Sequence, residues 1–126
     1  MKYKNLSDKI IGCAYKVYNT FGFGYLESVY EKCMEIEYKK NGLFYESQKQ
    51  IAVDYDGINV GNFIADAVVE NKIIIEYKSI IKLNKIHEMQ LVNYLVATGI
   101  DVGLLINFGE EEVEIKRKVR DLKDLK

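Results

Sequence analysis

Three charged side chains interrupt two otherwise apolar stretches in the middle of this sequence. Asp66 stands alone inside the run 63–69, and Glu76 and Lys78 follow the three isoleucines at 73–75. A buried charge is costly unless it is paired or binds an ion, and aspartate is disfavoured in strands. A local chemical reason is therefore expected for these residues.

A shared patch on a predicted sheet would supply that reason. Alternate residues of a strand point to opposite faces, so Glu76 and Lys78 share one face. A turn at residues 71–72 would place Asp66 near Tyr77, one step from both. Two acidic groups and one basic group therefore converge at the centre of the sheet.

This combination suits metal-assisted chemistry on a phosphate. Two carboxylates can hold a hard divalent cation such as Mg²⁺, which keeps water and substrate oxygens at its other positions. A lysine is a point charge that stabilises negative charge developing on a phosphate or orients an attacking water. The alternative for such a strand is a solvated face with a cross-strand ion pair.

Composition excludes several classes of protein. The chain has 126 residues, with 18 basic and 19 acidic side chains and a formal net charge of −1. This balance excludes a histone-like or polybasic mode of nucleic-acid binding, although it permits a small basic cleft. A hydrophobic fraction of 48% and a charged fraction of 29% indicate one ordered globular domain, spanning 1–126.

Neither a membrane anchor nor a secretion signal is predicted. No apolar run reaches the length of about 20 residues that a membrane-spanning helix needs, and the N-terminus lacks an apolar core. Cys13 and Cys33 fall within helical patterns, which indicates small buried hydrophobes in a reducing compartment. With the single His87 they cannot complete a four-ligand zinc site. We therefore expect a cytoplasmic protein.

Hydrophobic periodicity predicts the elements that position these residues. A first helix, capped by Ser7, would bury Ile10 and Val17, and a second at about 26–41 would bury Leu26 and Ile36. Further elements are three strands in an antiparallel meander at 50–55, 58–69 and 73–78, a helix at 84–98, and strands at 102–108 and 113–119. The order ααβββαββ predicts an α/β fold with a mixed sheet flanked by helices, in which the apolar 102–108 segment is central.

The acid, acid and lysine resemble the Asp…Glu-x-Lys core of the PD-(D/E)xK nuclease superfamily. The segment 24–30, GYLESVY, resembles the namesake motif of the GxxExxY family, a small prokaryotic branch of that superfamily. The segment 87–95, HEMQLVNYL, resembles the family's helix after the Glu-x-Lys strand and the Gln-x-x-x-Tyr motif of recombination-type exonucleases. The resemblance covers residues 7–120 and implies a restriction-endonuclease-like core.

Carried over by position, this resemblance implies a metal site. Asp66 and Glu76 would be the metal-binding carboxylates, helped by the backbone carbonyl of Tyr77, and Lys78 would be the catalytic lysine. Glu27 would be the helical glutamate that lies beside the metal or steadies the lysine. Without the resemblance, we favour interpreting Glu27 as an acidic residue placed favourably near a helix N-terminus.

The resemblance also implies a substrate-facing helix. Gln90 and Tyr94 would contact the substrate backbone or brace the site, and their spacing puts them on one helical face with His87. Without the resemblance, Gln90 and Tyr94 form an ordinary helix face. His87 fits a polar residue in the first helical turn as well as it fits a substrate contact.

The implied activity is metal-dependent hydrolysis of phosphodiester bonds in nucleic acid, with DNA favoured and Mg²⁺ or Mn²⁺ as cofactor. A homodimer is expected to extend the short footprint of so small a domain. The first alternative is a catalytically inactive binding or assembly module that keeps the fold, which the retained acid–acid–lysine set argues against. The second is a hydrolase of small phosphoesters, which a narrow cleft would favour.

The basic C-terminal run, residues 116–126, is interpreted as part of the fold rather than as a nucleic-acid contact. It contains both arginines of the chain, Arg117 and Arg120, and an acidic run at 110–112 offsets its charge. A contact with a DNA backbone is the alternative, but we favour a solvated edge strand and tail.

Overall fold

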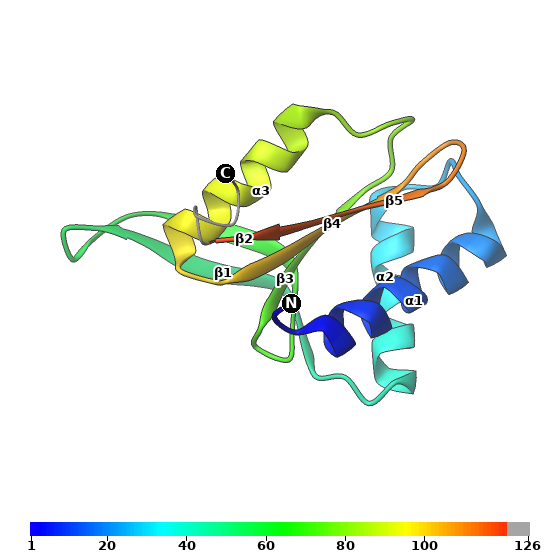
Figure 1. The fold of residues 1–126 in the computed structure, drawn as a ribbon, viewed down its shortest axis with the longest axis horizontal. Coiled ribbons are helices and arrows are strands. Elements are labelled where there is room, and N and C mark those ends of the chain that lie inside the picture. The colour runs from blue at the N-terminus through cyan, green and yellow to red at the C-terminus, as the bar shows by residue number, and fades with distance from the viewer. Residues whose placement is uncertain (121–126) are drawn as a thin grey trace.

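The structure, a computed structural model, describes residues 1–120 and consists of eight elements (Figure 1). Their bounds, in chain order, are α1 (Lys4–Phe21), α2 (Glu27–Lys40), β1 (Tyr45–Tyr55), β2 (Ile58–Val69), β3 (Ile73–Lys78), α3 (Lys85–Thr98), β4 (Val102–Phe108) and β5 (Val113–Val119). The predicted α/β class and the order ααβββαββ are confirmed.

All five strands form one mixed sheet in the order β1-β2-β3-β4-β5. The strands β1, β2 and β3 make the predicted antiparallel meander, while β3 and β4 pair in parallel. A parallel pair needs a crossover connection, which α3 supplies. Strand β4 is buried at every position between β3 and β5, as its apolar composition predicts.

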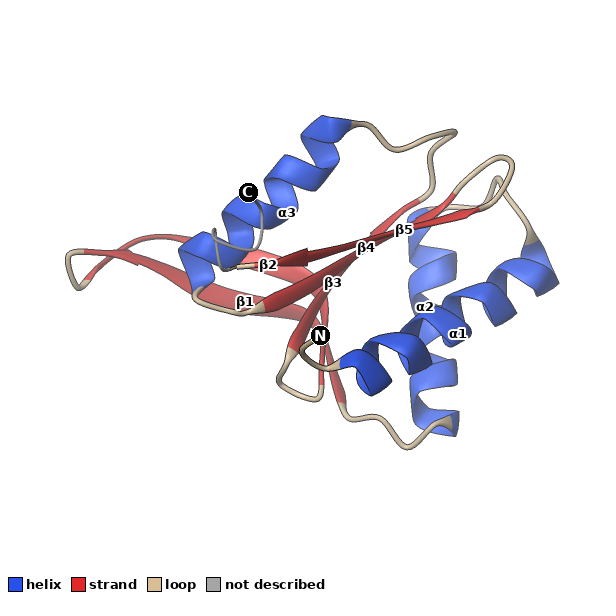
Figure 2. Cartoon of the chain, viewed as in Figure 1, coloured by secondary structure: helices blue, strands red, loops and turns tan. Residues whose placement is uncertain are grey.

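Helices cover both faces of the sheet (Figure 2). The α1–α2 side packs through Ile10, Tyr30 and Met34 against strand residues that include Ile75, Tyr77, Ile106 and Phe108. The α3 side packs through Leu91 and Leu95 against Ala65, Val68, Ile74 and Leu105. Within residues 1–120, no helix is both long enough and apolar enough to span a membrane.

Both hairpin turns of the meander use left-handed backbone. Asp56 and Gly57 have φ values of 52° and 75°, as expected for a tight two-residue turn. The second turn has φ values of 54° and 55° at Glu70 and Asn71, one residue earlier than predicted. A tertiary contact stabilises this turn, because the Glu70 carboxylate accepts a hydrogen bond from the Phe44 amide at 2.6 Å.

Two predictions about the first helices are wrong. Helix α1 begins at Lys4, and Ser7 is buried inside it rather than capping it. Helix α2 leaves Leu26 and Ile36 75% and 54% exposed. Its buried face instead carries two tyrosines, a methionine and Glu37. Glu37 can face inward because Lys16 of α1 pairs with it at 3.1 Å.

The two cysteines are free thiols in positions that suit packing. Cys13 is buried and Cys33 is half-buried. Burial raises the pKa of both thiols, and the Glu37 carboxylate adds to the effect. A raised pKa lowers the thiolate fraction and with it the reactivity of the sulfur.

Gly103 on β4 lies against Leu91 of α3, and its substitution tests how closely the helix packs on the sheet. An added Cβ would lie 2.8 Å from Leu91 Cδ1. We expect Gly103→Ala to lower the free energy of unfolding by about 1–3 kcal/mol, because the methyl group overpacks the core. Urea denaturation measures this. Gly61→Ala on β2, whose Cβ meets no atom within 4 Å, should change stability by less than about 0.5 kcal/mol, and equal losses would contradict the packing argument.

Candidate active site

The candidate site forms where β2 separates from β3. Backbone pairing between these strands is limited to residues 67–69 of β2 and 73–75 of β3. Beyond this point β2 continues only with β1, as a hairpin that projects from the rest of the sheet (Figure 1). Asp66 and Glu76 are the first residues past the paired region on their strands. The two strands therefore diverge at Asp66 and Glu76, and we call this point of divergence the fork.

The Asp66 side chain bonds to β3 at the point where backbone hydrogen bonds between β2 and β3 end. Its Oδ2 accepts a hydrogen bond from the Tyr77 amide at 2.9 Å, and Oδ1 accepts one from Gln48 Nε2 at 3.4 Å. Tyr77 is itself fixed from the opposite face, since its hydroxyl lies 2.5 Å from that of Tyr38. Asp66 thus lies against Tyr77, where hairpin geometry predicts it.

At Asp66 the alternation of side chains between the two faces of the sheet is also interrupted. Ala65 packs toward α3, whereas Ala67, two residues on, packs toward α1 and α2. Strict alternation would put both on one face. On β1, the residue opposite Asp66 is Gln48, which has a φ of 49° and is skipped in the pairing register. Asp66 therefore occupies an irregular position that the strand pattern alone does not show.

Glu76 has an unsatisfied carboxylate oxygen beside Asp66. Its Oε1 is buried and has no hydrogen-bond partner in the described part of the chain. Burial, and next the negative charge of Asp66, together raise the pKa of Glu76 to about 9, and Lys78 opposes this rise only weakly. At neutral pH the metal-free site consequently holds a proton on Glu76.

A cleft of about 160 Å³ opens in front of Glu76 and Lys78. Its other wall is α3, which contributes His87, Gln90 and Tyr94. These three residues follow one helical face, at spacings of three and four. The structure thus gathers five residues that the sequence analysis singled out around one cavity, with Asp66 adjoining it through Glu76 and the Tyr77 amide.

His87 both starts the helix and lines the cleft. Its Nδ1 accepts a hydrogen bond from the Asn84 amide at 3.2 Å, while Asn84 Oδ1 accepts from the amide of His87. This reciprocal pair is a capping box. Because Nδ1 is an acceptor, the neutral imidazole carries its proton on Nε2. The two sequence interpretations of His87 are therefore compatible.

The glutamates of α2 lie at different distances from the site. Glu27 is exposed, does not line the cleft, and makes no side-chain hydrogen bond within residues 1–120. Glu31, one turn later, accepts a hydrogen bond from Gln48 Nε2 at 2.8 Å, and the same amide group reaches Asp66. Burial raises the pKa of Glu31, as do Asp66 and Glu27, against an opposing effect of Gln48.

Sequence reasoning missed Glu31 and Gln48. Glu31 could have been found from its spacing, because it lies four residues after Glu27 on the same helical face. Gln48 has no such signal, since its part in the site depends on an irregular backbone conformation and on contacts across two elements.

The donor set fits one divalent cation with an incomplete protein shell. Among residues 1–120 no three His, Cys, Asp or Glu side chains are arranged to hold a metal. The carboxylates available at the cleft are Glu76 and its neighbour Asp66. Mg²⁺ is commonly held by one or two carboxylates together with waters and substrate phosphates. The unpartnered Glu76 Oε1 is a free ligand oxygen of the required kind.

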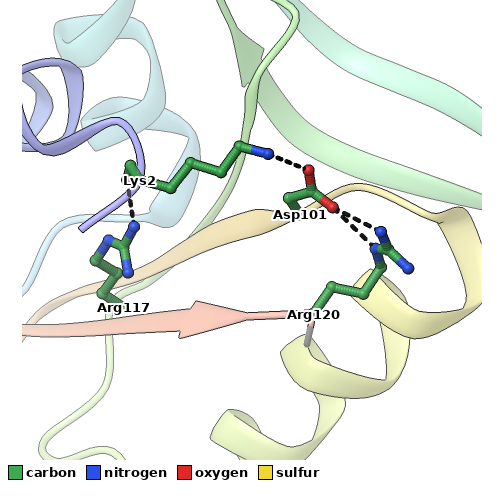
Figure 3. Close-up of polar contacts among 4 residues, drawn as sticks. All are labelled: Lys2, Asp101, Arg117 and Arg120. Atoms are coloured by element: carbon green, nitrogen blue, oxygen red, sulfur yellow. Dashed lines mark hydrogen bonds and ion pairs between the residues drawn. The ribbon is translucent and has the colours of Figure 1, made fainter. Parts of the chain in front are cut away.

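The C-terminal basic residues are engaged in structural contacts (Figure 3). Asp101 pairs with Lys2 at 2.6 Å and with Arg120 at 2.8 Å, and the Arg117 guanidinium donates to the Lys2 carbonyl oxygen. Lys118 pairs with a glutamate of α3 at 2.7 Å. These contacts favour the structural interpretation of the run up to Arg120, and residues 121–126 lie outside the described part of the chain.

Comparison with known proteins agrees with this geometry. A family model of the PD-(D/E)XK nuclease superfamily matches residues 4–118. A solved structure, described as "Crystal structure of SSO0001", is similar with a TM-score of 0.53 and 22% sequence identity. That similarity covers 74% of this chain and 50% of the other, so the chain spans half the length of that protein. No curated protein sequence matches the chain.

The protonated state of Glu76 predicts an unusual pH dependence of stability. From its ordinary value of 4.5 up to about 9, the folded protein keeps a proton that the unfolded chain releases. The free energy of unfolding in EDTA should therefore fall as pH rises through this window, with a slope of up to about 1.4 kcal/mol per pH unit from this group. Urea denaturation at pH 6 and pH 8.5 measures the slope.

Glu76→Gln cannot ionise and should lose this part of the slope. Glu111→Gln, in the exposed turn before β5, serves as the matched control and should keep it. Parallel slopes for wild type and Glu76→Gln would show that the Glu76 carboxyl is not protonated in the folded protein.

Proposed function

Because this chain belongs to the PD-(D/E)XK nuclease superfamily, we propose that it is a nuclease that hydrolyses phosphodiester bonds with a divalent cation, Mg²⁺ or Mn²⁺. DNA is the favoured substrate, and the segment 24–30 supports assignment to the GxxExxY branch. The observation that carries the proposal is the buried, unpartnered Glu76 Oε1 beside Asp66, at a cleft that also contains Lys78.

The carboxylates have distinct tasks in this proposal. A bound divalent cation would polarise the scissile phosphate and lower the pKa of an attacking water. Asp66 is oriented by its two hydrogen bonds, from the Tyr77 amide and from Gln48, and offers its remaining lone pairs. Glu76 loses its proton when it becomes a ligand, so cation binding should strengthen with rising pH.

The other cleft residues act on the phosphate itself. Lys78 shares a strand face with Glu76 and would supply positive charge where negative charge develops on the phosphate oxygens. The His87 Nε2–H group and the Gln90 amide are donors on the α3 wall and would orient those oxygens. Tyr94 would brace this wall, since its ring stacks on Phe63 with centroids 3.9 Å apart.

Cleavage assays with and without metal test the proposed activity directly. Single- and double-stranded DNA and RNA should include at least one substrate cut in Mg²⁺ or Mn²⁺ and left intact in EDTA. Lys78→Ala and Asp66→Asn should each reduce the rate at least about 100-fold, because each removes a charged group from the reacting centre. Gel electrophoresis of end-labelled substrates measures the rate.

Lys82→Ala, an exposed lysine outside the cleft, is the control and should retain wild-type cleavage. Full activity of Lys78→Ala or Asp66→Asn would refute the site. If no nucleic acid is cleaved with metal, the catalytically inactive binding module is favoured. If only small phosphoesters are cleaved, a small-phosphoester hydrolase is favoured. Sedimentation equilibrium tests the proposed homodimer.

The two glutamates of α2 can be separated by matched substitutions. We expect Glu31→Gln to weaken Mg²⁺ dependence, raising the half-maximal metal concentration about 10-fold or more, because second-layer partners of metal ligands have effects of about 10–100-fold. Glu27→Gln should also raise the half-maximal metal concentration if Glu27 acts at the metal, as the family resemblance implies. Metal titrations of the cleavage rate compare them. Wild-type behaviour of both variants would remove α2 from the site.

A further inference from the structure

A second, larger groove opens directly beside the candidate active site. It lies between the projecting β1–β2 hairpin and α3 and has a volume of about 670 Å³. Phe63, Ile64 and Tyr94 line both this groove and the cleft of the candidate site, so the two cavities adjoin each other. A polymer bound at the cleft is long enough to reach this groove.

The groove differs from the cleft in its chemistry. All of its lining residues belong to the described part of the chain, and none of them carries a charge. The Phe63 and Tyr94 rings stack at an interplanar angle of 16°, and Tyr94 is 36% exposed. Asn62 and Asn93 add amide groups from opposite walls. The exposed part of this aromatic pair and the two amide groups therefore lie side by side in the groove.

These properties match a nucleobase better than a phosphate. Phosphate backbones are held by positive charge, which this groove lacks. Bases stack on aromatic side chains and present edges that asparagine side chains can hydrogen-bond. The groove volume also falls within the range of about 300–1,000 Å³ typical of sites for molecules of this size.

We propose that this groove, the base groove, binds an unpaired nucleobase adjacent to the scissile phosphate. The proposal rests on the proposed nuclease function and narrows its substrate to nucleic acid that is single-stranded at the cut, including frayed ends and flaps. A base inside a duplex is stacked on both faces and paired at its edge, so it cannot offer either surface to Phe63, Tyr94 or the asparagines.

The hairpin tip supports an unpaired strand over a duplex. Asp54 and Asp56 are exposed at the tip, so a double helix that ran along the hairpin would bring its phosphates toward two negative charges. Like charges at this position oppose a long duplex lying along the hairpin. A flexible single strand can direct its bases into the groove and its phosphates away from these carboxylates.

Binding of base-containing and abasic strands tests the proposal. Fluorescence anisotropy in Ca²⁺, chosen to limit cleavage, compares a labelled 12-nucleotide thymidine strand with an abasic strand of equal length and with a duplex. The thymidine strand should bind the wild-type protein about tenfold or more tightly than the abasic strand, the effect expected of one base–aromatic stack. Equal affinities would overturn the proposal.

Variants locate the effect in the base groove. Asn62→Ala on β2 and Asn93→Ala, on the exposed side of α3, should each reduce the preference for bases and leave abasic binding unchanged, because both residues line the groove and neither lines the cleft. Ile58→Ala is the control, since Ile58 is 67% exposed on the same strand but outside the groove. A preference retained in both groove variants would overturn the assignment.

A spectroscopic measurement gives an answer that does not depend on the variants folding. A strand carrying 2-aminopurine at successive positions should lose fluorescence on binding at one position, next to the cut, where the base stacks on the aromatic pair. Uniform fluorescence at all positions would count against the proposal.

Three further outcomes would overturn the proposal and identify the reason. If the wild-type protein cleaves nucleic acid with metal but shows no base preference, the base groove fails and the nuclease function stands. If no strand binds and none is cut, both the base groove and the nuclease function are refuted. If the protein is a dimer that Ile64→Lys converts to a monomer, a second copy of the chain covers the groove instead.

Discussion

The candidate site depends on one hydrogen bond, from the Tyr77 amide to the Asp66 carboxylate, at 2.9 Å. This contact stands where the next rung of the β2–β3 ladder would be and so satisfies a backbone donor at the point where the two strands part. It fixes Asp66 at the fork, directly beside Glu76. Beyond it, β2 leaves the sheet with β1 as a projecting hairpin, whose inner side forms one wall of both the cleft of the candidate site and the proposed base groove.

This arrangement makes ionisation of the Glu76 carboxyl unfavourable. A carboxyl group buried beside a second carboxylate, with one oxygen unpartnered, opposes ionisation, and the pKa rises to about 9. Such a group lowers the stability of the metal-free protein at alkaline pH, where it is forced to ionise. A divalent cation would reverse the effect, because it favours the ionised form and supplies the missing partner. A carboxyl at this position of an apolar strand is therefore unfavourable for packing in the metal-free protein.

Helix α3 completes the site because its position is fixed at its N-terminus and at its middle. The capping box at Asn84 and His87 sets where the helix begins and therefore which side chains face β3. Gly103 lets the middle of the helix approach β4 through Leu91. With these two constraints, Gln90 and Tyr94 fall on the cleft side, and the Tyr94 ring meets Phe63 of the hairpin. The aromatic pair thereby joins the helix to the hairpin across the opening of the fork.

The sequence by itself determined the eight elements, their order, the meander and the position of Asp66 against Tyr77. These features follow from local regularities: the period of two in strands, the period of 3.6 in helices, and the chain reversal of a hairpin. The structure alone decided which face of α2 is buried, leaving Leu26 and Ile36 exposed, and that Glu31 rather than Glu27 reaches Asp66 through Gln48. It also decided the change of facing at Asp66. Periodicity reports only which residues share a face, whereas the face that is buried, and the distant side chains that meet there, are set by the packing partners.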